Sequence, residues 1–122
     1  ILILILIIVS VPLVINHVNR DLMTSSTLSA EYSAPEMESI YGDAMRAIFK
    51  FDEDGTVTFQ RCNLNTDTCA EPHSYTYKKH SLDIDIYSSL DYLVYDCLLK
   101  DSGKFLRCDD MSGRYQDYAK ID

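Results

Sequence analysis

The chain has 122 residues, with 11 basic and 19 acidic side chains and a formal net charge of −8. This balance lacks the basic surface that neutralises phosphates, so nucleic acid is not expected as a partner. Nine tyrosines, with only four glycines and three prolines, indicate one small β-rich domain of about a hundred residues after the apolar N-terminus.

The N-terminal segment, residues 1–19, carries no formal charge, and Arg20 is the first charged residue. An uncharged apolar run of this length spans about one bilayer core. No small residues follow it at the spacing of a signal-peptide cleavage site, which favours a retained single-pass anchor or packing helix. The next residues are acidic and poor in Lys and Arg, as on the translocated side of a membrane. We expect residues 1–18 to contact membrane lipid or the apolar helices of neighbouring subunits.

The region after the anchor divides at Pro35. Residues 20–34 are mostly small and polar, which predicts a stalk. Pro35 suits a first helical position, and acids follow it in the first turn. Apolar side chains then recur at helical spacing, at Met37, Ile40, Tyr41, Ala44 and Ile48. This pattern predicts a short amphipathic helix over residues 35–47, opening an extracytoplasmic disulfide-bonded domain over residues 35–122.

The rest of the domain alternates apolar and polar residues. Residues 48–51 and 56–59 predict a hairpin, and a three-residue loop over 53–55 pairs Phe51 with Val57 and Phe49 with Phe59. The acidic loop does not place ligands as an EF-hand does. Residues 73–80 and 82–86 predict strands, and residues 92–99 with 104–108 a second hairpin, although a helix also fits residues 88–100. Residues 114–122 are predicted to be a partly ordered tail. The fold expected is α+β: a transmembrane-type helix, a short amphipathic helix and a small antiparallel β-meander.

The four cysteines admit three disulfide pairings. The hairpins place Cys62 opposite Cys69 and Cys97 opposite Cys108, near disulfide distance, so we predict two hairpin disulfides. Crossed pairs, reduced thiols and a metal site are the alternatives. Two disulfides imply an oxidising extracytoplasmic space, with the periplasm or cell surface favoured.

The sequence contains no motif for a catalytic nucleophile, a phosphate loop or a metal cluster. We therefore expect no enzymatic activity, catalytic residue, cofactor or metal. The acidic residues Asp83, Asp85, Asp91 and Asp96 are interpreted as solvating strand edges. Five tyrosines are candidates either for core packing or for a protein interface: Tyr75, Tyr77, Tyr87, Tyr92 and Tyr95.

Three functions fit these features. The first is a membrane-anchored structural or accessory subunit that contributes its domain to a larger extracytoplasmic assembly. The second is a filament subunit, because the layout resembles that of type IV pilins in outline; pilins carry Glu at their fifth position, where this chain has Ile5. The third is a secreted small binding protein after signal cleavage.

Overall fold

The fold is known from a computed structural model, which describes residues 22–36 and 44–121. It consists of antiparallel strands joined mostly by short turns. The strands are β1 (Ala30–Glu36), β2 (Met45–Phe51), β3 (Thr56–Asn63), β4 (Thr68–Cys69), β5 (His73–His80), β6 (Asp83–Tyr87), β7 (Leu93–Lys100), β8 (Phe105–Asp109) and β9 (Tyr115–Ile121).

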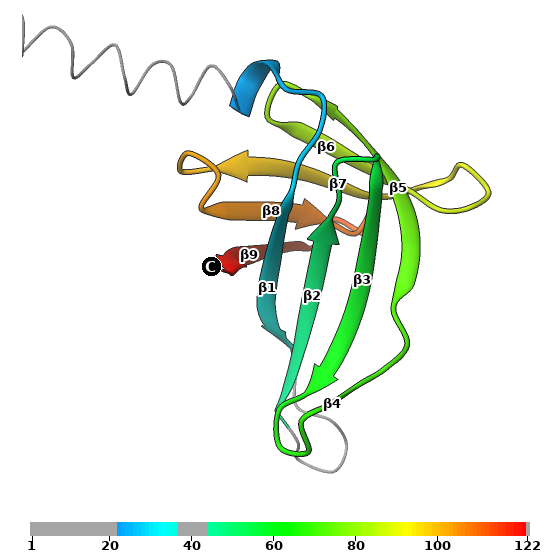
Figure 1. Ribbon diagram of the computed structural model, residues 1–122, viewed down its shortest axis with the longest axis vertical. Helices are drawn as coiled ribbons and strands as arrows, with labels where there is room; N and C mark the ends of the chain where they lie inside the picture. The colour runs from blue at the N-terminus through cyan, green and yellow to red at the C-terminus, as the bar shows by residue number, and fades with distance from the viewer. Residues whose placement is uncertain (1–21, 37–43, 122) are drawn as a thin grey trace, which may run out of the picture.

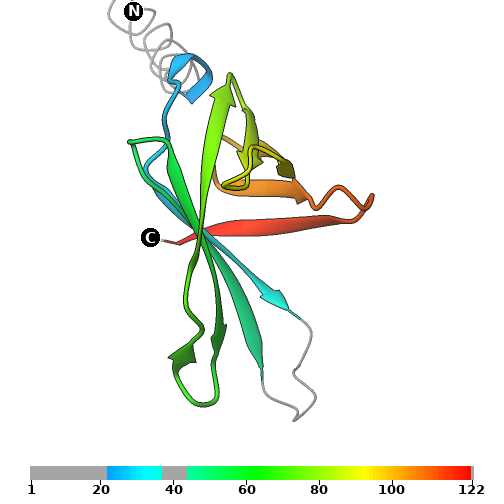
Figure 2. The same ribbon diagram turned by 90° about the vertical axis from the view of Figure 1, so that its right-hand side faces the viewer.

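Eight of these strands close into a barrel. The sheet order runs β2-β1-β9-β8-β7-β6-β5-β3, and a further pairing of β2 with β3 joins the two ends. Among the described strands, the short strand β4 pairs only with β3. Figure 1 shows β1, β2 and β3 running close to the vertical while β8 and β9 run across them. The view turned by 90° shows the two groups of strands crossing at a wide angle (Figure 2), as strong twist in a closed sheet requires.

The core fills the barrel because alternate side chains on each strand point inward. At its centre Phe49 is 0% exposed, and its ring lies 4.9 Å from those of Phe59 and Tyr118 between centroids. The other fully buried large side chains are Tyr32, Phe51, Val57, Ile84, Ile86, Cys97, Leu99 and Leu106. Aromatic and branched residues at period two therefore build one continuous interior.

The local pairings that the alternation predicts are confirmed. Phe49 pairs with Phe59 and Phe51 with Val57, and Gly55 has a φ of 89° in the turn. Strand β5 covers the predicted residues 73–80, and residues 93–100 form strand β7. These pairings involve residues close in sequence, so alternation and turn chemistry are sufficient to determine them.

The α+β fold class is wrong, since the described residues form an almost entirely β structure. Pro35 lies in β1 and Ala47 in β2, so the described parts of residues 35–47, at both ends of the predicted amphipathic helix, are strand; residues 37–43 lie outside the described residues. Pro35 lies beyond Ser33, the last β1 residue that pairs with β9, and proline is tolerated where a strand lacks a neighbour. On β2 the period-two pattern of Ala47, Phe49 and Phe51 decides the conformation.

The two terminal regions also differ from the predictions. Residues 115–121 form strand β9 instead of a tail, and the stalk region includes β1, which pairs with β9 through Glu31 and Ile121. Within residues 22–36 and 44–121, no helix is long and apolar enough to cross a membrane. The predicted anchor at residues 1–19 lies outside the described residues and remains a prediction.

Candidate functional site

The barrel has two ends that differ in what covers them. The first, which we call the capped end, carries the turns at residues 52–55, 81–82 and 101–104 together with residues 22–29, which we call the strap. The second, which we call the open end, carries the connections at residues 64–67, 88–92 and 110–114 among the described parts of the chain. Because successive strands alternate in direction, these two sets of turns lie at opposite ends.

Hydrogen bonds from inside the barrel hold the strap on the capped end. The Tyr77 hydroxyl accepts a hydrogen bond from the Leu28 N–H at 2.8 Å and donates to the Asp52 carbonyl at 2.6 Å. The Tyr32 hydroxyl donates to the Gly103 carbonyl at 2.6 Å. Burial raises the pKa of Tyr32 to about 12 and also raises the pKa of Tyr77, so both hydroxyls keep their protons at neutral pH. Tyr77 of β5 thus joins the strap to the turn after β2, and Tyr32 joins the start of β1 to the turn between β7 and β8.

A buried lysine completes this attachment. Lys79 points inward from β5 and is only 5% exposed. Its ammonium donates to the carbonyl of Leu22 and, at 2.5 Å, to that of Ser25. Burial lowers the pKa of Lys79, and the strap carbonyls provide the hydrogen bonds that the ammonium loses on leaving water. Sequence reasoning missed this residue, although it continues the inward alternation of Tyr75 and Tyr77.

The open end has a hollow of about 280 Å³. Its lining combines buried and exposed side chains and is largely polar. Phe59, Cys108 and Tyr118 are buried and Tyr95 is half-buried, whereas the exposed lining residues are Arg61, Asp110, Arg114, Tyr115 and Gln116. Barrel mouths of this kind are common sites for small ligands. We take this hollow, together with the loops around it, as the candidate functional site.

The five tyrosines singled out in the sequence do not share one surface. Tyr77 is buried, and Tyr75 and Tyr95 are partly buried against the core. Tyr87 is half-buried and its ring lies 5.3 Å from the Lys78 ammonium. Tyr92 is 68% exposed in a loop at the open end. Core packing therefore accounts for three of them, and Tyr92 has the largest exposed fraction of the five.

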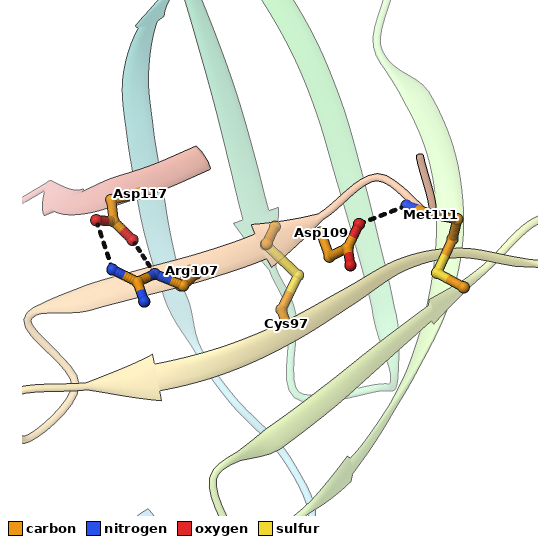
Figure 3. The surroundings of a disulfide bond; sticks show 6 residues. Cys97, Arg107, Asp109, Met111 and Asp117 are labelled. Carbon is orange, nitrogen blue, oxygen red and sulfur yellow. Dashed lines mark hydrogen bonds and ion pairs between the residues drawn. A yellow bond between two sulfur atoms is a disulfide. The ribbon is translucent and has the colours of Figure 1, made fainter. Parts of the chain in front are cut away.

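Both disulfides join the pairs that the hairpins predict. Cys62 bonds to Cys69 and Cys97 to Cys108. The second bond lies inside the barrel beside the hollow, with its cysteines 1% and 2% exposed. Figure 3 shows Cys97 linked to the neighbouring strand, close to the ion pair of Arg107 with Asp117. Two disulfides are compatible with an oxidising extracytoplasmic location.

The acidic residues gather on the outer face. Asp96 on β7 lies directly opposite Asp85 on β6 and Asp109 on β8. Partial burial raises the pKa of Asp96, and the surrounding carboxylates, Asp85 first, raise it further. Among the residues that the structure describes, no group of three or more His, Cys, Asp or Glu is arranged to hold a metal ion.

We expect Asp96→Asn to raise the free energy of unfolding by about 0.5 kcal/mol at pH 7, because it removes a like-charge contact across strands. The folded chain holds the Asp96 proton more tightly than the unfolded chain, so the stability cost of Asp96 builds up as the pH rises from the ordinary aspartate pKa to the raised one and is fully present above it. Below the ordinary aspartate pKa of about 4 the difference between variant and parent should vanish. Urea unfolding at both pH values measures this.

Asp117→Asn is the matched control with the opposite sign. The hydrogen bond from Arg107 lowers the pKa of Asp117, so its charge stabilises the fold above the ordinary pKa and the benefit is lost as the pH falls through the lowered one. This variant should be less stable than the parent at pH 7. A loss of stability at pH 7 in Asp96→Asn would contradict the expected repulsion.

The chain matches no family model, no curated protein and no solved structure. The geometry of the two barrel ends is therefore the basis for the function proposed below.

Proposed function

We propose that this chain is an extracytoplasmic accessory subunit, without enzymatic activity, that binds a protein partner through the open end of its barrel. The observation that carries this proposal is the contrast between the two ends. At the open end Leu90 is 75% exposed, Tyr92 68% and Met111 53%. The capped-end turns instead present Glu53, Asp54 and other polar residues to solvent, and Met23 of the strap, at 49%, is less exposed than these three side chains. Exposed aromatic and Met side chains are typical of protein interfaces.

The loop at residues 88–92 is built to present its apolar side chains. The Ser88 N–H donates to the Tyr92 carbonyl at 2.8 Å, and the Asp91 N–H donates to the Ser88 carbonyl at 3.0 Å. The Ser88 hydroxyl accepts from the N–H groups of Leu90 and Tyr92. A loop ordered in this way loses less entropy when a partner binds it.

Met111 provides a second indication at the same end. Its φ is 70°, a conformation that Gly or Asn adopts at lower cost than a bulky side chain does. Its side chain is nevertheless largely exposed. A contact with another molecule would explain a large apolar residue at this position.

The position of the strap indicates which end of the barrel would face the membrane. It enters the barrel at the capped end, so an anchor preceding Leu22 would hold that end toward the membrane. The open end would then face away from the lipid and toward an assembly. The predicted anchor at residues 1–19 and the proposed protein interface are therefore compatible in one arrangement.

A photo-crosslinking residue placed at Leu90 should form a discrete adduct with a second protein in intact cells, whereas the same residue at Glu53 should not. The difference is expected because Leu90 lies at the open end and Glu53 at the capped end. Adding Tyr92→Ser should weaken the Leu90 adduct by removing a neighbouring contact. Adducts are identified by immunoblotting and mass spectrometry.

Equal adducts from both positions, or none from Leu90, would contradict the proposal. Adducts of the chain with itself would favour the filament alternative instead. Non-reducing gels of each variant confirm that both disulfides have formed, so a lost adduct cannot be attributed to misfolding.

A further inference from the structure

We infer that one side of the capped end lies directly on the membrane surface, where exposed apolar side chains of β7, β8 and β9 enter the lipid headgroup layer. The inference rests on the membrane attachment in the proposed function, and it adds the surface through which the barrel contacts lipid. It is carried by a short tether, by a strap that is fixed to the barrel, and by an apolar patch beside the strap.

The tether between the predicted anchor and the barrel is short. Residues 1–19 carry no formal charge, and Val18 is the last apolar residue before Leu22, the first residue that the structure describes. The four residue steps between these two span at most about 14 Å when fully extended. The headgroup layer on one side of a bilayer takes up about 5 to 7 Å of this reach. An anchor that leaves the lipid near Val18 therefore holds Leu22 within about 10 Å of the headgroups.

The strap does not act as a flexible spacer, because it is fixed to the barrel from its first residue. The Lys79 ammonium donates to the carbonyls of Leu22 and Ser25. The Leu22 side chain packs over the turn between β7 and β8, where a Cβ added at Gly103 would lie 3.4 Å from the Leu22 Cδ1 atom. This turn, at residues 101–104, therefore lies next to the point where the anchor joins the barrel.

Exposed apolar side chains gather on the outer face beside the same turn. Phe105 begins β8, and Leu98 of β7 and Ile121 of β9 lie diagonally across from it on the neighbouring strands. We call these three residues the apolar flank; Leu98 is 41% exposed, Phe105 39% and Ile121 37%. Diagonal neighbours of this kind are within reach of an aromatic side chain. In Figure 1 the turn between β7 and β8 and the end of β9 lie on the same side of the molecule.

The opposite side of the capped end has a different surface. Its turn after β2 presents Glu53 and Asp54 to solvent. Among the described residues of the capped end, the exposed large apolar side chains are those of the apolar flank and Met23, which lies beside residues 101–103. Apolar side chains on one wall, held level with the headgroups, suit the boundary between headgroups and acyl chains. The barrel therefore rests on its flank, with the acidic turn lifted away from the lipid.

Lysines border the apolar flank. Lys104 and Lys120 are both exposed, and the Lys120 N–H donates to the Lys104 carbonyl at 2.9 Å. A lysine at a membrane surface packs its stem against apolar groups and keeps its ammonium at the level of the headgroups. Asp101 is exposed in the same turn, so we expect apolar burial, and not net charge, to hold the flank on lipid. Phosphatidylcholine alone should then be sufficient for the contact.

The test is fluorescence quenching of the whole chain, reconstituted in phosphatidylcholine vesicles that contain brominated acyl chains. The chain has no tryptophan, so a single introduced tryptophan reports its own distance from the lipid. Phe105→Trp and, separately, Ile121→Trp should lose half of their emission or more, because an indole in the headgroup layer reaches the acyl boundary. Tyr92→Trp at the open end and Glu53→Trp on the acidic side are the matched controls and should keep their emission.

Detaching the strap should weaken the contact. Lys79→Gln removes the ammonium that holds Leu22 and Ser25, so quenching of Phe105→Trp should fall by half or more as the strap frays and the tether lengthens. Lys78→Gln is the matched control, since Lys78 points outward from β5, and it should leave the quenching unchanged. Tyr77→Phe removes the hydroxyl that binds Leu28 and gives the same comparison if Lys79→Gln does not fold.

Equal quenching of Phe105→Trp and Glu53→Trp would overturn the flank as the contact surface. An unquenched Phe105→Trp in a chain that floats with the vesicles would overturn the lipid contact itself, and quenching that requires added phosphatidylglycerol would overturn its apolar basis. A chain that does not float with the vesicles would overturn the predicted anchor and this inference with it. Phe105→Glu should abolish the quenching of Ile121→Trp and keep the Leu90 crosslink, which separates failure of the lipid contact from failure of the proposed interface.

Discussion

Phe49→Ala should lower the free energy of unfolding by about 3 to 5 kcal/mol, the usual cost of removing a large aromatic side chain from a core. Phe49 is 0% exposed, and its ring meets four others. Those of Phe59 and Tyr118 lie at 4.9 Å, that of Tyr95 at 5.2 Å and that of Phe51 at 6.2 Å. The substitution leaves a cavity shared by β2, β3, β7 and β9, which a closed barrel cannot collapse to fill.

Phe105→Ala is the matched control, because Phe105 points outward from β8 and is 39% exposed. Its loss should cost about 1 kcal/mol or less. Urea unfolding in mild detergent, followed by tyrosine fluorescence, compares the two variants. Phe49→Leu, expected to cost about 1 to 2 kcal/mol, keeps the comparison possible if the alanine variant does not fold. Equal losses at Phe49 and Phe105 would contradict the inside-outside assignment of the strands.

Replacing Cys97 and Cys108 together by alanine should lower the free energy of unfolding by about 3 to 4 kcal/mol. Closing a loop of this length contributes about 2 to 3 kcal/mol through the unfolded chain, and loss of the buried sulfur atoms adds a cavity term of about 1 kcal/mol. Both cysteines are almost fully buried, and the bond crosses between β7 and β8 beside Tyr95, in the wall of the hollow.

The control for this variant is the double alanine substitution of Cys62 and Cys69. Its loop is of similar length, with a sequence separation of 7 against 11, so the effect on the unfolded chain is about the same. Cys69 is exposed, and Cys62 is 7% exposed against 1% and 2% for the other pair, so the cavity term is smaller. Local fraying of the short strand β4 can also absorb part of the loss. A larger loss for Cys62 and Cys69 than for Cys97 and Cys108 would contradict this reasoning.

The local hairpins could be predicted from the sequence because each has its partners nearby. Phe51 pairs with Val57 across a short turn, and inward alternation allows only one register that keeps both in the core. The same argument brings Cys97 opposite Cys108. Each pairing follows from one turn and one alternating pattern, so it can be predicted without knowledge of the rest of the fold.

The barrel closure could not be predicted in the same way. β1 and β9 pair between Glu31 and Ile121, at opposite ends of the domain sequence. β1 carries one large inward side chain, Tyr32, among small and polar residues, and β9 carries Tyr118. Neither β1 nor β9 shows a strong alternating pattern by itself. Each forms a strand because the other strands would otherwise leave two edges with unpaired backbone N–H and C=O groups. Because the strand pattern is weak here, the helical spacing of apolar residues led to a helix being predicted for residues 35–47.

The sequence by itself predicted the hairpin register of Phe49 and Phe51 and favoured both disulfide pairings over the alternatives, since these depend on contacts between near neighbours. Only the tertiary structure decided which residues share an end of the barrel. Arg61 and Arg114 are 53 positions apart in sequence and belong to no motif, yet closure brings both to one hollow. Lys79 likewise acquires its partners only when the strap crosses the capped end. Sites formed by residues from strands distant in sequence depend on closure of the barrel, and no local sequence pattern predicts that closure.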